Sequence, residues 1–203
     1  QLDKGQDQKL NRYALPNVST PDEVKAGIEA SLSFFELAPD KISIPLWVAP
    51  YAASISSWFE DNFASLYLVG PSGSRKTALA VLALCHFGNF TANNLYTFND
   101  STNSLEKASF ILKDAPMLID DFYPTTITKD QKRMISTFES ITRSAGNRSG
   151  RGRMNKDLGL RSTFYPRGMA WFTGEDLIGA SSALARLTFV KIEPNLIDLL
   201  KLG

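Results

Sequence analysis

The chain has 203 residues, 43% of them hydrophobic and 21% charged, so it can bury the core of one domain, and a disordered or collagenous chain is excluded. Lysine and arginine together number 22 and aspartate and glutamate 21, so net charge by itself predicts no nucleic-acid or membrane partner. Cys85 is the only cysteine, which excludes an internal disulfide framework and a multi-cysteine zinc site and indicates an intracellular, cytoplasmic protein.

The amino-terminal end of the chain carries no pattern of a membrane or secretory segment. No apolar run approaches the roughly 20 residues that span a bilayer, so we expect no membrane partner. The chain starts at Gln1 without a signal-peptide pattern, and we expect it to be a piece of a longer protein. Residues 1–19 are polar and aperiodic, which predicts an arm or linker.

Two helices are predicted in the next segment, residues 20–60. Residues 20–23 supply an N-cap, a proline at the first helical position and a capping-box glutamate, which open a helix to about residue 37. A second, apolar helix is predicted over residues 45–59, with Pro50 as a point at which it can kink. We treat this N-terminal helical segment as separate from the core that follows.

Strands alternate with helices over residues 61–203, which we assign to one core. Short apolar runs predict strands at residues 65–69, 95–99, 117–122, 168–174 and 186–192. Helices are predicted at residues 76–88, at 103–112 with a cap from Asn103 and Glu106, and at 129–143. This alternation predicts an α/β fold with a parallel five-stranded sheet covered by helices on both faces.

Several conspicuous side chains are predicted to be structural. Trp47, Trp58 and Trp171 lie in apolar segments and are expected in the core. Cys85 and His86 have no further ligand at metal-binding spacing, so we expect a packed helix end there.

A glycine-containing loop joins the first predicted strand to the helix after it. Its sequence is Gly70-Pro71-Ser72-Gly73-Ser74-Arg75-Lys76-Thr77. The loop resembles the phosphate-binding motif G-x-x-x-x-G-K-[ST], whose backbone N–H groups and helix N-terminus hold the phosphates of ATP. Lys76 is expected to reach the β and γ phosphates, and the Thr77 hydroxyl to bind Mg²⁺. Arg75 replaces the second glycine; the alternative is a Gly/Ser turn before a core helix.

Paired carboxylates end the apolar strand "APMLIDDF", about forty residues after the loop. In this Walker B arrangement Asp120 is expected to bind Mg²⁺, through water, and Asp121 to polarise the attacking water. The usual second residue is glutamate, so Asp121 is one methylene short. Without the preceding loop, two acids at a strand end would be read as a solvated turn.

The order of these elements resembles the AAA+ division of P-loop ATPases. A narrower likeness, over about residues 45–192, is to the helicase-like ATPase domains of primase–helicase proteins of phages, plasmids and staphylococcal mobile elements. It is carried by "PLWVAPYAASI", "GPSGSRKT", "FNDSTNSLE", "APMLIDDF" and "WFTGE". The resemblance implies a three-layer αβα P-loop NTPase fold and a ring, expected to be a hexamer. Arg75 and Asp121 depart from the common ATPase pattern, although superfamily 3 helicases also carry Asp-Asp.

Two further site residues are implied by this resemblance. Thr173, at the end of the strand in "WFTGE", corresponds to the sensor 1 residue beside the γ-phosphate; the alternative is a strand-ending turn. Arg186, just before the last strand, corresponds to an arginine finger that enters the neighbouring subunit's site. The alternative is a surface arginine. The residues after 192 are too few for a helical lid of the common AAA+ kind, so we expect the lid to be absent, to lie elsewhere in the chain, or to lie outside this sequence.

A basic, glycine-containing segment separates the Walker B helix from the Thr173 strand. It has a single acidic residue, Asp157, against Arg143, Arg148, Arg151, Arg153, Lys156, Arg161 and Arg167. This composition suits contacts with a phosphate backbone without sequence readout. In superfamily 3 and minichromosome-maintenance helicases the same interval carries a DNA-contacting hairpin, and the resemblance implies contact with single-stranded DNA here. We select as contacts Arg148, Arg151, Arg153 and Lys156; a solvated loop or a subunit contact is the alternative.

The sequence as a whole predicts a Mg²⁺-dependent ATPase that forms a ring and translocates on DNA, as part of a replication or mobile-element protein. One rival is an initiator or loader, in which nucleotide governs assembly and hydrolysis is slow. The other is a small-molecule kinase, which would leave the basic segment without a role.

Overall fold

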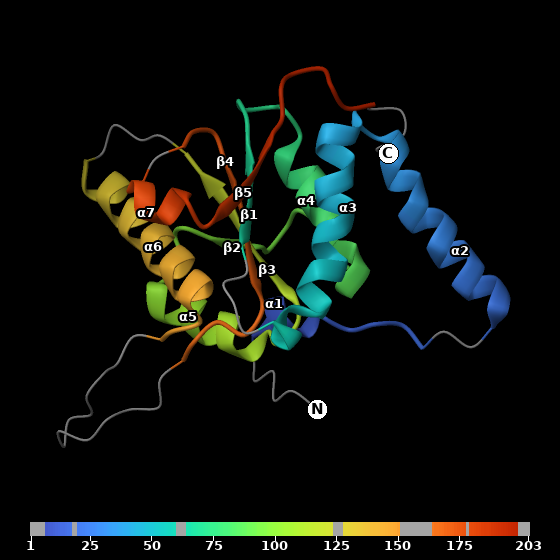
Figure 1. Ribbon diagram of the computed structural model, residues 1–203, viewed down its shortest axis with the longest axis horizontal. Coiled ribbons are helices and arrows are strands. Elements are labelled where there is room, and N and C mark those ends of the chain that lie inside the picture. Colours follow the sequence, from blue (N-terminus) through green and yellow to red (C-terminus); the bar gives the residue numbers. More distant parts are fainter. Residues whose placement is uncertain are drawn as a thin grey trace.

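A parallel sheet forms the centre of the molecule (Figure 1). The computed structural model describes residues 7–17, 20–59, 64–123, 128–150, 164–177 and 179–198. Five strands pair in the order β2-β3-β4-β1-β5, all parallel. Their bounds are β1 Ser65–Val69, β2 Tyr96–Thr97, β3 Pro116–Phe122, β4 Met169–Gly174 and β5 Leu187–Lys191. Because β4 lies between β1 and β3, the segments that follow these three strands meet at one edge of the sheet.

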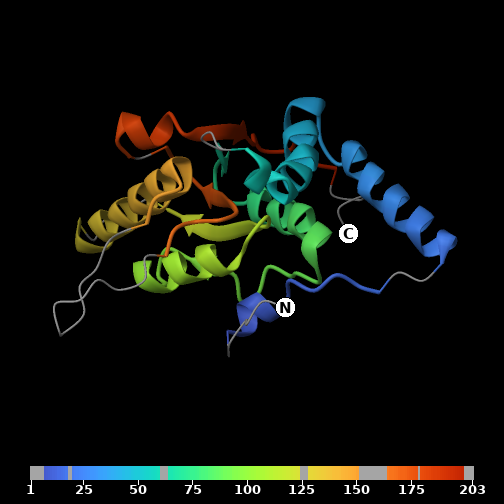
Figure 2. The same ribbon diagram turned by 60° about the horizontal axis from the view of Figure 1, so that its bottom comes forward.

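Helices cover both faces of this sheet (Figures 1 and 2). On one face lie α3 (Asp40–Ser54) and α4 (Lys76–Leu84); on the other lie α5 (Thr102–Ile111) and α6 (Thr128–Asn147), with the short α7 (Ser181–Leu184) beside α6. Each face has its own cluster of buried apolar side chains, one centred on Leu46 and Trp171 and the other on Phe138 and Phe172. The predicted fold class, a three-layer α/β P-loop fold with five parallel strands, is confirmed.

Helix α3 differs from its predicted bounds. It begins at Asp40, earlier than expected, and ends at Ser54, with Pro45 and Pro50 inside it. A proline is tolerated best in the first turn of a helix, so the sequence predicted that this helix begins at Pro45. The structure extends it because the side chains at helical spacing are buried against the sheet, namely Ile42, Leu46, Ala49 and Ala53.

Some local predictions were wrong. Trp58, expected in the core, belongs to the short 3₁₀ helix η2 (Ser56–Trp58) and is 82% exposed, whereas Trp171 is buried as predicted. The N-cap of α5 is Ser101 rather than Asn103: the Ser101 Oγ accepts a hydrogen bond from the Ser104 N–H at 3.2 Å. Strand β2 is only two residues long.

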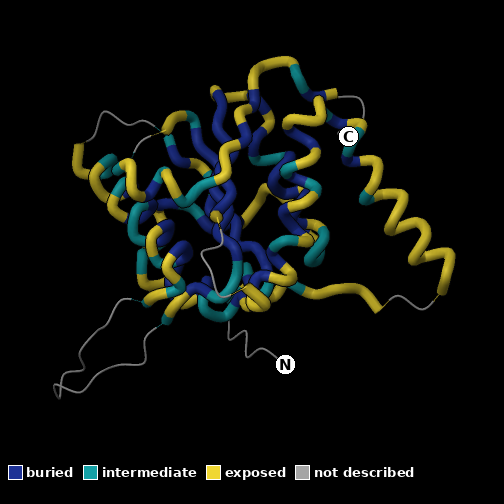
Figure 3. Tube along the Cα trace, in the orientation of Figure 1, coloured by how far each residue is buried: buried dark blue, intermediate teal, exposed yellow. Residues whose placement is uncertain are grey.

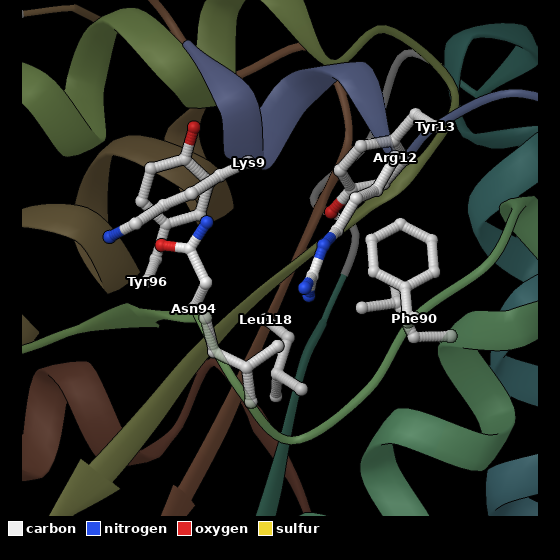
Figure 4. A pocket seen from close by; sticks show the side chains of 9 residues that line it. Lys9, Arg12, Tyr13, Phe90, Asn94, Tyr96 and Leu118 are labelled. Atoms are coloured by element: carbon white, nitrogen blue, oxygen red, sulfur yellow. The ribbon is translucent and has the colours of Figure 1, made fainter.

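Residues 7–17 lie in the segment where we expected an arm or linker, and they contact the core. In the short α1 (Gln8–Asn11), Lys9 Nζ lies 2.9 Å from Asp100 Oδ2. The Tyr13 hydroxyl donates to the Pro116 carbonyl at 2.8 Å, and its ring packs edge-on against Phe90 at 4.8 Å between centroids (Figure 4). These contacts hold the segment beside the start of β3.

Helix α2 (Pro21–Leu32) begins with the predicted capping box between Thr20 and Glu23. None of its residues is buried, and it projects from the body of the molecule (Figure 3). None of the helices in the described ranges combines the length and the apolar character needed to cross a membrane.

The packing of α3 predicts that it contributes directly to the stability of the core. Leu46 is fully buried, and Leu46→Ala should lower the free energy of unfolding by about 2–5 kcal/mol. Ile44, on the same helix but 45% exposed, is the matched control, and Ile44→Ala should cost less than about 1 kcal/mol. Urea denaturation measures both. Equal losses would contradict the packing of α3 against the sheet.

Candidate nucleotide site

The candidate site lies at the carboxyl ends of β1, β3 and β4. Gly174 is paired with Val69 of β1 on one side and with Phe122 of β3 on the other. The loop 70–75 leaves β1 at this level, and α4 begins at Lys76. Ligands of parallel α/β sheets bind in the crevice outside the carboxyl ends of the strands. The sequence motifs therefore meet where this fold binds ligands.

The loop accommodates Arg75 at the position where the motif has glycine. Arg75 adopts the left-handed conformation with φ 65°, which costs roughly 1–2 kcal/mol relative to glycine, and its side chain is exposed. Gly73 has φ 78°, a conformation that glycine adopts freely. The loop thus keeps the backbone turn of a phosphate-binding loop without the second glycine.

Gly70 serves a purpose that the sequence did not indicate. A Cβ atom at this position would collide with the Ile192 carbonyl oxygen, just beyond the end of β5. The first glycine of the loop is therefore required by the close approach of another segment of the chain.

Lys76 is the first residue of α4 and is largely buried, with 9% of its surface exposed. Its ammonium group donates to the Pro71 carbonyl at 2.9 Å, across the loop. Burial lowers the pKa of Lys76, and the negative charges of Glu175, Asp120 and Asp121 act in the opposite direction. A further negative group, such as a phosphate, would therefore favour the charged form of this lysine.

Asp120 connects the helix after the loop with two strands. Its Oδ1 accepts a hydrogen bond from the Thr77 hydroxyl at 2.8 Å and a second one from the Thr173 hydroxyl. Thr173, which is buried, also accepts a hydrogen bond from the Asp121 N–H at 3.0 Å. Four residues selected from the sequence are thus joined directly, and Thr173 holds both aspartates.

Asp121 has an unusual backbone at the end of β3. Its φ is 66°, and the pairing of β3 with β4 shifts register between Ile119 and Phe122. Such irregularities often re-aim a side chain next to an active site. Burial raises the pKa of Asp121; Asp120 and Glu175 raise it further, and Lys76 opposes them. A carboxylate with a raised pKa is a better proton acceptor, as a general base requires.

Glu175 is a site residue that the sequence analysis missed. Its N–H donates to the Phe122 carbonyl at 2.8 Å, which places it between the ends of β3 and β4. Among the charges that raise the pKa of Lys76, that of Glu175 is the largest. The available signal was its position two residues after Thr173 in "WFTGE", directly past a strand end.

Arg186 lies at the opposite end of the strands, just before β5 (Leu187–Lys191). Its carbonyl accepts a hydrogen bond from the Ser65 N–H at 3.0 Å, at the start of β1. The five residues of β1 span about 16 Å, so Arg186 is remote from the loop of its own chain. Its guanidinium donates to Asn147 Oδ1 at 3.0 Å and to the Ser182 carbonyl.

The selected DNA contacts are only partly described. Arg148 donates to the Ser56 carbonyl and lies at the same edge as Arg186. The other three, Arg151, Arg153 and Lys156, lie outside the described residues.

The donor atoms at the candidate site fit a nucleotide with Mg²⁺. The described part of the chain has no group of three or more His, Cys, Asp or Glu residues that could hold a metal ion. Mg²⁺ in nucleotide sites is held by one or two protein oxygens together with phosphates and water, and Thr77 and Asp120 supply such oxygens. The Ser74 hydroxyl of the loop is buried without a hydrogen-bond partner among the described residues. A phosphate oxygen would provide one.

Comparisons with known proteins bear on the fold. No protein-family model and no curated protein matches the chain. Among solved structures, it is similar to "SCCmec type IV Cch - active helicase", with 16% identity, a TM-score of 0.57, and coverage of 94% of this chain and 34% of that chain. "The X-ray structure of JCV Helicase" aligns with 14% identity and a TM-score of 0.47, over 83% of this chain and 45% of that one. The first likeness shows a shared fold, and the chain spans 34% of the length of that helicase chain.

The hydrogen bond between Thr173 and Asp121 predicts protection of the Asp121 amide. Thr173→Val removes the acceptor, and exchange of the Asp121 amide hydrogen should accelerate about fivefold, the effect of losing a bond worth about 1 kcal/mol. Thr173→Ser keeps a hydroxyl and should preserve most of the protection. Hydrogen exchange followed by NMR gives both values, with the amide of Leu46, in the interior of α3 and away from Thr173, as internal control. Unchanged exchange in the valine variant would refute the bond.

Proposed function

We propose that this chain is the ATPase core of a DNA motor, a Mg²⁺-dependent helicase or translocase that acts as a ring. The observation that carries the proposal is the direct contact of Asp120 with Thr77 and Thr173. A hydroxyl at the start of the helix after a phosphate-binding loop, held by a strand-end carboxylate, is the Mg²⁺–phosphate arrangement of P-loop NTPases. A Gly/Ser turn with no function would not need it.

Each site residue has a defined role in ATP hydrolysis under this proposal. The N–H groups of residues 70–77 and the ammonium of Lys76 hold the phosphates, and Thr77 and Asp120 hold Mg²⁺. When bound, Mg²⁺ neutralises charge on the phosphate oxygens. Asp121 orients a water and takes its proton while the water oxygen bonds to the γ-phosphorus and the bond to the bridging oxygen of ADP breaks. Thr173 positions both aspartates.

The remoteness of Arg186 from its own loop supports a ring. An arginine finger in a homo-oligomer acts on the neighbouring subunit, so it need not lie near the site of its own chain. The hydrogen bonds of Arg186 to Asn147 and Ser182 can hold the guanidinium until a neighbour binds. We expect a hexamer, although the argument requires only a closed ring.

The basic segment supports DNA, single-stranded in our proposal, as the partner. Arg148 and Arg167, in the described ends of the segment, lie at the end of the sheet opposite the nucleotide site, where backbone phosphates can bind without competing with ATP. The similar fold of a chain described as an active helicase supports the same reading.

A loader in which ATP binding controls assembly is the second candidate. Asp121 favours it, because its side chain is one methylene shorter than the usual glutamate and hydrolysis could be slow. The ATPase rate with and without single-stranded DNA separates the candidates: a motor is stimulated several-fold, a loader hydrolyses slowly in both conditions, and a small-molecule kinase is indifferent to DNA.

The nucleotide site predicts the behaviour of Lys76→Ala. This variant should lose ATP binding or hydrolysis and keep its fold, because burial already disfavours the charged amine that it removes. Lys25→Ala, which removes an exposed lysine of α2 away from the loop, is the control and should behave as wild type. Binding of a fluorescent ATP analogue, ATPase rate and circular dichroism measure the three properties. Undiminished ATPase activity in Lys76→Ala would remove the nucleotide-site assignment.

The ring predicts that Arg186→Ala binds ATP normally and hydrolyses it on the order of 10³ to 10⁵ times more slowly. Arg143→Ala, which removes another arginine near Ser182, is the control and should hydrolyse ATP at the normal rate.

Mixing Arg186→Ala with Lys76→Ala gives the sharper measurement. Some interfaces of a mixed ring pair an intact loop with an intact arginine, and these should recover ATPase activity. No recovery in rings shown to contain both variants would mean that Arg186 does not act across an interface.

A further inference from the structure

The end of the sheet at which its strands begin lies opposite the nucleotide site and forms one connected surface. It consists of the segments that precede β1, β3 and β4. The Ser57 N–H and hydroxyl donate to the two carboxylate oxygens of Asp114 at 2.8 and 2.9 Å. The Asp114 N–H donates to the Arg167 carbonyl at 3.2 Å. Three segments far apart in the sequence are thus fixed relative to one another.

Aromatic side chains are exposed on this surface. Trp58, next to Ser57, is 82% exposed, and Tyr165, two residues before Arg167, is 43% exposed. Tyr165 is supported from behind, because its ring packs edge-on against Phe110 with 5.7 Å between centroids. The exposed indole of Trp58 leaves most of its apolar surface in water, where it is available to a binding partner.

Basic groups are interleaved with these rings. The Arg167 guanidinium lies 4.1 Å from the centre of the Phe110 ring and donates to the Phe110 carbonyl. Arg148 donates to the carbonyl of Ser56, at the start of the turn that ends with Trp58. Asp114 is the acidic residue at the centre of this network. The Nζ atom of Lys113 lies 3.8 Å from Oδ2 of Asp114.

The sequence between the two anchored ends adds more positive charge. Residues 151–163 lie outside the described ranges, and their composition is four basic residues against one acid, a net charge of +3. The chain enters this segment after Arg148 and leaves it just before Tyr165. A partner bound to the described part of this surface meets the positive charges of Arg148 and Arg167 together with exposed aromatic rings.

We propose that Trp58 and Tyr165 stack against the bases of a single-stranded nucleic acid, while Arg148 and Arg167 lie near its phosphates. The inference deepens the proposed function and rests on it. Base faces are accessible in a single strand and covered in a duplex, so stacking selects single strands, whereas basic groups alone bind either form. Stacking on the exposed rings would make this surface prefer single strands to duplexes, whereas the basic groups alone would not distinguish them.

The test compares two oligonucleotides of equal length, oligo-dT and an abasic strand with the same phosphates, by fluorescence anisotropy with a non-hydrolysable ATP analogue present. Trp58→Ala should weaken binding of oligo-dT by about 5- to 150-fold, and Trp58→Phe should retain most of the affinity. The salt dependence should not change, because no phosphate contact is lost. Ile28→Ala, at a 55% exposed position on α2, is the matched control and should bind as wild type.

The abasic strand isolates the contribution of the bases. It should bind more weakly than oligo-dT and be indifferent to the Trp58 substitution. Oligo-dT binding by Trp58→Ala equal to wild type would overturn the inference and leave the proposed function intact. A changed oligomeric state of Trp58→Ala in sedimentation, with DNA affinity unaltered, would also overturn it, because the surface would then join copies of the chain. Failure of the wild type to bind either strand while it binds ATP would overturn both the inference and the DNA part of the proposed function.

Discussion

The arrangement of the nucleotide site depends on one carboxylate oxygen, Oδ1 of Asp120. It accepts hydrogen bonds from a helix residue, Thr77, and from a strand residue, Thr173, so α4, β3 and β4 are fixed to one another through a single atom. The parallel order β3-β4-β1 makes this possible, because it brings the ends of these strands to one level. In a part-buried polar network of this kind, each polar group that water does not reach needs a hydrogen-bond partner. The hydroxyls of Thr77 and Thr173 meet that condition for Asp120, and Thr173 in turn accepts from the Asp121 amide.

Two groups of side chains with different chemistry lie at opposite ends of the strands. Carboxylates and a buried lysine lie past the strand ends, and arginines with exposed aromatic rings lie before the strand starts. The distance between them is about the length of β1, about 16 Å. In the proposed motor, a change at one edge reaches the other through movement of whole strands and helices.

The sequence predicted the parts of the site that follow from strand ends. A buried strand, a glycine turn and a helix fix where Lys76 and Thr77 lie, and parallel pairing brings Asp120 and Thr173 to them. The fold class followed from the same alternation. The start of α3 was missed because tertiary burial outweighed the local cost of Pro45, and Trp58 was misplaced because an apolar neighbourhood in sequence does not specify which face is covered. Glu175 and the reason for Gly70 depend on contacts between β4, β3 and the end of β5, which no local pattern encodes.

At Gly70 the loop backbone lies in close contact with the chain just beyond β5, the last strand in the sequence. Only a hydrogen atom separates the Gly70 backbone from the Ile192 carbonyl, and Arg186 precedes the other end of the same strand. A side chain at position 70 would have to displace Ile192, so the start of the loop and the end of β5 are fitted closely to each other. Strand β5 therefore connects Arg186 to the contact at Gly70 along a single extended backbone. In the proposed ring, the arginine expected at the subunit interface and the loop 70–75 therefore lie at the two ends of one strand.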